Sequence, residues 1–501
     1  MVEAAAVSQE HPYSPATRRY VLIAAILASS MGFIDGSVMS IAIPAIRADL
    51  GATLADAQWI SNGYMLLLSS LILLGGAAGD RFGLRNTFGL GIVVFVAASI
   101  VCALAPTPEV LIGARVVQGA GAAFMVPGSL AIIAKAYPRD ERGKAIGIWA
   151  AASSLTSIGG PIVGGLILTL FGDWSWRLVF AINLPLGAIA LALLWLKVPA
   201  DHPEAGRKLD SIGAVLATTA LMLIAFGLTG TGSDSVPPLS HMALYVGAGL
   251  VVAIGFIVWE AQTRTPMLPL RLFGQRSFSG ANGLTFALYF ALAGTMFFLP
   301  MTMIGGWGAT PADVALAMLP MGILLTVLSS FSGAMADRYG PAPLIAGGSV
   351  IVALAFTVLG LTTPLHNVWF AVLPSIGLLG LGMGLVVSPL STAVMTSVED
   401  SDTGVASGVN NAVARVAGLM AVALLGLVVA SVFERALGSA AELPIFFGLA
   451  TEGLAPAEEA ARVAATDAAF AAVAYITAGL SLVSAGIAWL TLEHKRPVAP
   501  A

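Results

Sequence analysis

The sequence predicts an all-α membrane protein with fourteen transmembrane helices. Of its 501 residues, 58% are hydrophobic and 10% are charged, whereas about a quarter of the residues in an ordinary soluble domain are charged. A transmembrane helix needs about 20 mostly apolar residues. Fourteen such segments occur, beginning near residues 20, 55, 84, 109, 142, 177, 211, 239, 276, 312, 341, 368, 403 and 468.

The distribution of basic residues predicts the orientation of the chain, because short cytoplasmic loops carry an excess of Lys and Arg. With a cytoplasmic N-terminus, 17 of the 23 basic residues fall on the cytoplasmic side and 4 on the other side. The remaining 2, Arg115 and Arg415, lie within predicted helices. We therefore expect both termini to be cytoplasmic, as an even number of helices requires.

Two pairs of short segments recur with similar spacing and indicate an internal repeat. GDRFG at 79–83 follows the second apolar segment, and ADRYG at 336–340 follows the tenth, 257 residues later. Gly143, Ala145 and Gly147 recur as Gly404, Ala406 and Gly408, 261 residues later. The repeat predicts two six-helix bundles plus two inserted helices, and many transporters built from parallel repeats bind substrate between them. The expected divisions are a tail at 1–19, the N-terminal bundle at 20–200, the inserted pair at 201–263, an interfacial linker at 264–275, the C-terminal bundle at 276–492 and a tail at 493–501.

Asp35 is the one charged residue between positions 21 and 46, a segment long enough to cross a bilayer. A charged group inside hydrocarbon costs at least a few kcal/mol and survives mainly where it faces a polar pathway. Such a carboxylate is a candidate functional site by default. We therefore interpret Asp35 as a proton acceptor.

The segment from Gly76 to Arg85 joins the second and third apolar segments on the predicted cytoplasmic side. Its glycines permit a tight turn and a close approach of helices, and Asp80 is placed to meet a helix N-terminus or a basic side chain of the other bundle. Such a charged turn can latch one conformation. A solvated turn that only sets the topology explains the same residues equally well.

These segments and others, in their order, resemble the major facilitator superfamily, and within it the fourteen-helix drug:proton antiporters of the EmrB/QacA group. The loop 76–85 is similar to the signature loop of the superfamily, and 333–340 to its weaker second copy. LIGARVVQGAG at 111–121 resembles the fourth-helix motif, whose arginine is associated with proton coupling, and GPIVGG at 160–165 resembles the antiporter motif of the fifth helix. FIDGSVMSIAIP at 33–44 resembles the first helix of the EmrB/QacA group. The resemblance spans nearly the whole chain and implies the major facilitator fold.

The resemblance also implies roles for individual residues. It implies proton coupling through Asp35 and Arg115; a conformational latch at Gly76, Asp80, Arg81, Gly83, Arg85, Asp337 and Arg338; and an antiporter motif at Gly160, Pro161, Gly164 and Gly165. The latch departs from the family pattern at Leu84 and Pro341, where basic residues are expected, so Arg338 is a weaker assignment than Arg81. A structural kink without a role in transport is the alternative for the Gly-Pro motif, because proline kinks a helix and glycines permit close packing.

Asp35 and Arg115 are predicted to lie at depths that differ by about the reach of an arginine side chain. At about 1.5 Å per residue, Asp35 lies roughly 17 Å and Arg115 roughly 8 Å from the outer ends of their helices. A contact between them, direct or through water, is therefore a prediction for the structure to test.

Other polar side chains in predicted helices are candidates for lining a substrate cavity, although a structural network between helices explains them equally well. They are Asn62, Tyr64, Gln118, Asn282, Tyr289, Asn410, Asn411 and Arg415. Met and Phe side chains can add an adaptable apolar surface, with ordinary core packing as the alternative, at Phe297, Phe298, Met301 and Met303.

Several classes of function lack their motifs. Gly143-Lys144 is followed by Ala145 rather than by Ser or Thr, so we expect no phosphate-binding loop and no ATP drive. The five histidines form no metal-like cluster, and we expect no metal, no cofactor and no enzymatic activity. The net charge of −4 is spread over loops and tails, so we expect no nucleic-acid partner.

These observations predict a proton-coupled multidrug efflux antiporter that exports hydrophobic or amphipathic compounds by alternating access, with about one proton per cycle through Asp35. Because no second carboxylate lies deep in a predicted helix, neutral, monocationic or weakly anionic substrates are favoured over dications. One alternative is a dedicated proton-coupled exporter or importer of one metabolite, siderophore or lipid. Another is a membrane sensor or structural protein without transport. We expect a monomer in the bacterial inner membrane, with protons and a small molecule as partners and a periplasmic adaptor left open.

Overall fold

The computed structural model describes residues 13–201, 209–438, 444–451 and 453–494. Fourteen helical segments in these ranges are long and apolar enough to cross a membrane, which confirms the predicted fold class. Residues 1–12 and 495–501 of the predicted tails, with Arg207 and Lys208 of the predicted cytoplasmic side, lie outside the described residues.

The N-terminal bundle contains six of the spanning segments, and the sixth is broken at Ile182. Ser14, Thr53 and Thr107 each precede a helix and accept a hydrogen bond from a backbone N–H of its first turn, as N-cap residues do. The elements are α1 (Pro15–Leu50), α2 (Leu54–Phe82), α3 (Leu84–Ala103), α4 (Pro108–Ala136), α5 (Arg139–Phe171), η1 (Asp173–Ser175), α6 (Trp176–Ala181) and α7 (Asn183–Lys197).

The C-terminal bundle repeats this arrangement. The pairs α2–α4, α3–α4, α1–α5 and α1–α7 pack together in the first bundle, and α11–α13, α12–α13, α10–α14 and α10–α15 pack correspondingly in the second. Its elements are α10 (Arg276–Met301), η3 (Thr302–Gly306), α11 (Pro311–Tyr339), α12 (Pro341–Thr362), η4 (Thr363–Leu365), η5 (Val368–Val372), α13 (Leu373–Thr396), η6 (Asp400–Asp402), α14 (Thr403–Leu437) and α15 (Pro456–Thr491).

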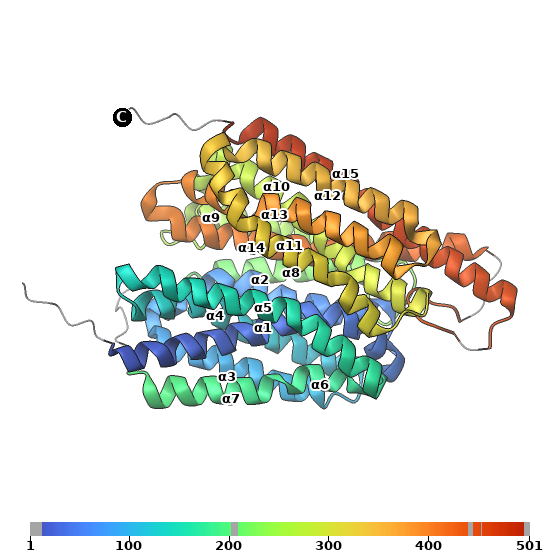
Figure 1. Cartoon of the computed structure of the whole chain (residues 1–501), viewed down its shortest axis with the longest axis horizontal. Coiled ribbons are helices and arrows are strands. Elements are labelled where there is room, and N and C mark those ends of the chain that lie inside the picture. Colours follow the sequence, from blue (N-terminus) through green and yellow to red (C-terminus); the bar gives the residue numbers. More distant parts are fainter. Residues whose placement is uncertain (1–12, 202–208, 439–443, 452, 495–501) are drawn as a thin grey trace, which may run out of the picture.

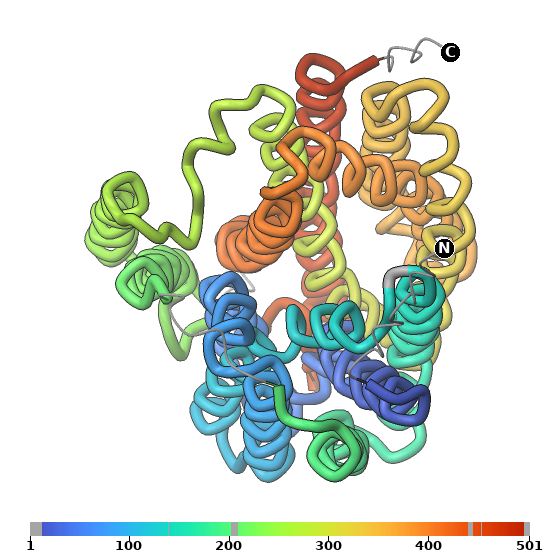
Figure 2. Tube along the Cα trace, turned by 90° about the vertical axis from the view of Figure 1, so that its left-hand side faces the viewer, coloured from blue at the N-terminus to red at the C-terminus, as the bar shows by residue number. Residues whose placement is uncertain are grey.

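Two further helices, α8 (Ser211–Thr229) and α9 (Leu239–Gln262), lie at the edge of the molecule. Figure 2 shows this green pair outside the two bundles. Helix α8 packs on α2 and α14, one from each bundle, and α9 packs on α8. The short η2 (Leu270–Gly274) then leads into α10.

The last helix begins at Pro456, twelve residues before the predicted start near 468. Proline is favoured in the first turn of a helix, and the Glu458 carboxylate accepts a 2.7 Å hydrogen bond from the N–H of Ala455. Charged side chains between Pro456 and the predicted start led the sequence analysis to place this segment in a loop. Arg462 is nevertheless buried. Its burial is compensated by hydrogen bonds that it donates to the carbonyl oxygens of Gly305 and Leu449.

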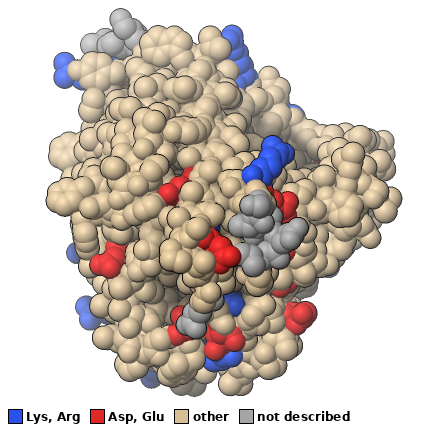
Figure 3. Space-filling view, turned by 90° about the vertical axis from the view of Figure 1, so that its right-hand side faces the viewer, with Lys and Arg blue, Asp and Glu red and all other residues tan. Residues whose placement is uncertain are grey.

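The two bundles lie side by side with their helices roughly parallel (Figure 1). Both described ends of the chain lie at one end of the helices, on the left of Figure 1, which we call the terminal end. Figure 3 faces the opposite, far end, where acidic side chains are scattered over the surface. The bundles are joined by hydrogen bonds at the far end, where Gln58 of α2 donates to the carbonyl oxygen of Val422 of α14 at 2.5 Å.

Candidate functional site

An ion pair lies inside the N-terminal bundle. Arg115 of α4 donates from Nη1 to Oδ2 of Asp35 of α1 at 2.6 Å, and both side chains are almost completely buried. The predicted contact between the two residues is therefore direct in this structure. Because removing one partner of a buried pair leaves an uncompensated charge, each side chain strongly constrains the other.

Gln118 holds the two charged groups together. One helical turn beyond Arg115, its Oε1 accepts from Arg115 Nη1 at 2.7 Å and its Nε2 donates to Asp35 Oδ1 at 3.1 Å. Gln118 was predicted to line the substrate cavity, but it is fully buried within the bundle. Its Nε2 also donates to the hydroxyl of Ser99 at 3.0 Å, and Asn183 donates to that hydroxyl at 3.2 Å.

The guanidinium of Arg115 is fixed on its other sides as well. Its Nε donates to the carbonyl oxygen of Ile60 at 3.0 Å, and its Cζ lies 4.4 Å from the centre of the Tyr64 ring. A cation over an aromatic face is stabilised by the ring quadrupole. Tyr64, a predicted cavity residue, is buried in contact with the ion pair.

Five of the remaining cavity candidates lie in three different environments. Asn410 donates to Asn282 Oδ1 at 3.2 Å and to the hydroxyl of Thr285 at 2.8 Å, so these residues join α14 to α10. Asn411 is exposed in the first half of α14, and its Oδ1 accepts a 3.1 Å hydrogen bond from Nε of Arg415. Asn62 is buried, and neither polar atom of its side chain has a hydrogen-bond partner among the described residues.

The Gly-Pro motif of α5 lies where three helices meet. A Cβ atom on Gly164 would lie 2.3 Å from Cγ1 of Val38 of α1, and one on Gly165 would lie 2.7 Å from the carbonyl oxygen of Pro311 of α11. Real Cβ atoms essentially never approach other atoms so closely. Gly165 therefore permits a contact between the two bundles that any other residue would obstruct.

A pocket of about 240 Å³ lies between the bundles beside this contact. Helices α1, α5, α10 and α11 line it, with Ser37, Ser40, Pro161, Met296 and Met318 among the lining residues. The Met and Phe side chains predicted to form an adaptable surface are instead buried in the hydrophobic core, at Phe297, Phe298, Met301 and Met303. The methionines that line the pocket are others, Met296 of α10 and Met318 of α11 among them.

At the terminal end of the molecule, a residue outside the loop motif 76–85 caps the start of α3. Asp201, which follows α7, accepts hydrogen bonds from the backbone N–H groups of Leu84 at 2.6 Å and Arg85 at 3.0 Å, and from Lys135 at 2.9 Å. Burial acts to raise the pKa of Asp201, but these hydrogen bonds hold the pKa below its ordinary value. The first turn of α3 is therefore stabilised by Asp201, whereas Asp80 is exposed.

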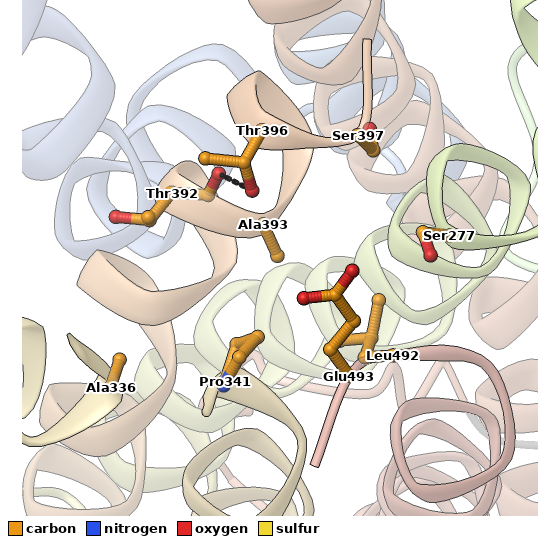
Figure 4. Close-up of a pocket in the computed structure, with 9 residues that line it drawn as sticks. All are labelled: Ser277, Ala336, Pro341, Thr392, Ala393, Thr396, Ser397, Leu492 and Glu493. Atoms are coloured by element: carbon orange, nitrogen blue, oxygen red, sulfur yellow. Dashed lines mark hydrogen bonds between the residues drawn. The ribbon is translucent and has the colours of Figure 1, made fainter. Parts of the chain in front are cut away.

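The second copy of this loop is capped by backbone rather than by a carboxylate. Gly340 has a φ of 85°, as Gly83 has a φ of 90°, and the N–H of Ala342 donates to the carbonyl oxygen of Glu493 at 3.2 Å. Figure 4 shows the pocket beside this contact, with the Glu493 side chain among those that line it. Its volume of about 30 Å³ holds only a few water molecules, so it is too small for a drug-sized substrate.

Sequence reasoning missed the role of Arg47, which is one of the four basic residues on the predicted external side. It is buried at the far end, where it pairs with Asp234 at 2.8 Å and donates to the carbonyl oxygen of Phe447 at 2.5 Å. It thereby joins α1, the loop between α8 and α9, and the segment before α15. Within the described part of the chain, no group of three or more His, Cys, Asp or Glu residues could hold a metal ion.

In the described part of the chain, fourteen apolar helices form two bundles and an outer pair, with a pocket between the bundles, which is the architecture of a multi-pass membrane transporter. The chain belongs to the Major Facilitator Superfamily, whose family model matches residues 25–422 and 281–501.

Relatives of known name are about one third identical to this chain. The "Probable actinorhodin transporter" of Streptomyces coelicolor is 33% identical over 438 residues, which cover 85% of this chain and 74% of that protein. The "Methylenomycin A resistance protein" of the same organism is 32% identical over 414 residues, 82% of this chain and 85% of that protein. Among solved structures, a bacterial homolog of the human lysosomal transporter Spinster, in an inward-facing and occupied conformation, matches with a TM-score of 0.68 and 18% identity over 95% of this chain and 97% of that one. That likeness concerns the fold.

Proposed function

We propose that this transporter is a proton-coupled efflux antiporter that exports hydrophobic or amphipathic compounds by alternating access. The observation that carries the proposal is the ion pair of Asp35 and Arg115, sealed inside the N-terminal bundle. The names of relatives that confer resistance to antibiotics support export as the direction of transport.

The ion pair provides a way to couple a proton to a conformational change. While Arg115 lies 2.6 Å from Asp35, the charged carboxylate is stabilised. A rearrangement that separates the pair would leave the carboxylate in an apolar interior, where the neutral, protonated form is favoured. In the proposed cycle Asp35 accepts a proton from outside as substrate leaves, and releases it to the cytoplasm as substrate binds.

The proposed stoichiometry is about one proton per cycle, because Asp35 is the acidic group at the centre of the site. Glu260 of α9 is also buried, but it lies near the end of its helix and accepts a 2.8 Å hydrogen bond from the N–H of Leu268. We therefore assign Glu260 to the attachment of the linker rather than to proton transport.

The distribution of Lys and Arg supports a cytoplasmic terminal end and an external far end. We accordingly propose a bacterial inner-membrane location with both termini cytoplasmic. The hydrogen bonds between the bundles at the far end then correspond to a state in which the external side is closed. The latch loops, with Asp80, Arg81, Asp337 and Arg338, are proposed to meet across the cytoplasmic side when access switches.

A narrower substrate range is a second candidate. Both relatives described above are named after a single antibiotic. These names support a dedicated exporter of one natural product, whereas other relatives are named multidrug resistance proteins and support a broad exporter. Competition among a panel of compounds for efflux would separate the two, because a dedicated exporter is inhibited by one chemical class alone.

The test of proton coupling compares two Asp→Asn variants of α1 in proteoliposomes with an imposed pH gradient. Asp35→Asn should lose gradient-driven efflux while keeping exchange of substrate between the two sides, because a neutral amide cannot carry the proton. Asp49→Asn is the matched control, because it removes an aspartate that pairs with Arg177 at the partly exposed end of the same helix. Gradient-driven efflux that persists in Asp35→Asn would exclude the proposed role of Asp35.

A further inference from the structure

Arg415 is a second arginine inside a transmembrane helix, and its environment is the opposite of that of Arg115. It lies in the first half of α14, and among the described residues its one hydrogen bond is from Nε to Asn411 on its own helix, at 3.1 Å. No carboxylate lies within ion-pair distance of it in the described part of the chain. Arg415 is half-buried. The two terminal nitrogens of its guanidinium are not fully buried, so they are accessible to solvent or to a ligand.

The position of Arg415 along α14 directs it toward the space between the bundles. Seven residues before it, Gly408 faces Leu73 of α2, and seven residues after it, the carbonyl of Val422 accepts from Gln58 of α2. Residues seven apart share one face of a helix. Arg415 therefore lies on the face of α14 that opposes the N-terminal bundle, between these two contacts.

Helix α14, which carries Arg415, packs against one helix of each bundle: α2, which carries Tyr64, and α10, which carries Tyr289. Tyr64 is buried, with its ring centre 4.4 Å from Cζ of Arg115. Helix α14 therefore lies where the two bundles meet.

In the ranges that the structure describes, Arg115 has a carboxylate partner that neutralises its charge, and Arg415 does not. Asp35 neutralises Arg115 at 2.6 Å, whereas the charge of Arg415 has no acidic partner among the described residues. An unpaired charge within a membrane helix is costly and marks a pathway or a ligand site. Among the described residues, Arg415 therefore leaves a positive charge uncompensated on the face of α14 that opposes the N-terminal bundle.

We propose that Arg415 and Asn411 form an anion subsite, and that the exported compounds are amphipathic acids. The planar guanidinium matches a carboxylate with two parallel hydrogen bonds. This inference deepens the proposed export function and rests on it for the direction of transport. It narrows the expected range of neutral, monocationic and weakly anionic compounds to the last of these.

The test uses a panel of naphthyl and phenyl carboxylic acids, each paired with its uncharged methyl ester, and binding to the purified full-length protein. Wild type should bind the acids more tightly than the esters. Arg415→Gln should weaken acid binding by about tenfold or more, since a charge-assisted hydrogen bond contributes roughly 1.5–3 kcal/mol, and should change ester binding by less than about twofold. Arg435→Gln, at the exposed end of the same helix, is the matched control and should change neither.

Two further variants distinguish a subsite from a structural role. Arg415→Lys keeps the charge but lacks the planar fork, so it should recover part of the acid binding. Asn411→Ala should weaken acid binding selectively, because it removes the acceptor that orients the guanidinium. An equal loss of acid and ester binding in Arg415→Gln would identify a structural role and overturn the proposal. So would wild-type protein that binds the esters as well as the acids, or binds neither.

The failure of this inference is separable from the failure of proton coupling. Asp35→Asn should abolish gradient-driven efflux of acid and ester alike, whereas Arg415→Gln should reduce that of the acid alone. If Asp35→Asn leaves efflux intact while Arg415→Gln loses acid binding selectively, the coupling proposal fails and the anion subsite stands.

Discussion

Nη1 of Arg115 lies 2.6 Å from Oδ2 of Asp35, and Gln118 binds both side chains within the N-terminal bundle. This arrangement predicts strong coupling between the two charged residues in a double-mutant cycle. Arg115→Gln alone should destabilise the protein by about 3–5 kcal/mol, because it leaves a buried carboxylate unpaired. The double variant Asp35→Asn with Arg115→Gln should be more stable than Arg115→Gln, since no charge is then left unpaired.

The measurement is thermal or denaturant unfolding of the four proteins in one detergent. Arg177→Gln with Asp49→Asn forms a control cycle at the far end of α1, where both side chains are partly exposed. That pair should show a coupling energy below about 1 kcal/mol. Additive effects at Asp35 and Arg115 would contradict a direct ion pair.

Gly165 predicts how closely α5 and α11 must approach. A Cβ atom there would lie 2.7 Å from the carbonyl oxygen of Pro311 and 2.8 Å from Cβ of Ala315. Gly165→Ala should therefore disfavour the state with the far ends joined by about 1–3 kcal/mol, and reduce transport roughly tenfold. Gly159→Ala is the matched control in the same helix, because nothing lies within 4 Å of its added Cβ. Equal transport by the two variants would show that this contact does not limit the cycle.

Asp201 predicts a dependence of stability on acid pH. Its pKa in the folded protein is held below the ordinary value of 3.8 by hydrogen bonds from Lys135 and from the first turn of α3, which outweigh burial. A carboxyl whose pKa is lower in the folded state stabilises the protein above its unfolded pKa. That stabilisation is lost as the pH falls through the lower, folded pKa. Asp201→Asn should lower the melting temperature at pH 7 and reduce its fall below about pH 4. Melting curves of both proteins between pH 3 and pH 7 provide the measurement, and parallel pH profiles would refute this role of Asp201.

The fold and the central ion pair could be predicted because each leaves a local mark in the sequence. Apolar segments give the helices, and counting residues along them placed Asp35 and Arg115 within reach of each other. The environment of Gln118 could not be predicted in the same way, since a face that is polar in sequence can point into a bundle or into a cavity. Arg47 and Asp201 were missed because their partners are distant in sequence: Phe447 for the first, and Leu84 and Arg85 for the second.

Arg47 predicts that closure of the far end depends on one buried side chain. It connects α1 to Asp234 at 2.8 Å and to the carbonyl oxygen of Phe447 at 2.5 Å. Arg47→Met removes both contacts and should shift the protein toward a state in which the far ends are apart. A cysteine at Thr169, whose hydroxyl accepts from the N–H of Ala312 across the bundle contact, reports this change in a Cys102→Ala background. Its labelling by a membrane-impermeant maleimide should be several-fold faster with Arg47→Met than without it.

The control for this experiment is Arg435→Met, which removes an exposed arginine at the far end of α14. It should leave the labelling rate at position 169 unchanged, because among the described residues the Arg435 side chain makes no hydrogen bond to the other bundle. If Arg47→Met also leaves the rate unchanged while the protein stays folded, Arg47 stabilises the loops at the far end without controlling access. A rise in both variants would instead point to a general effect of charge on the reagent.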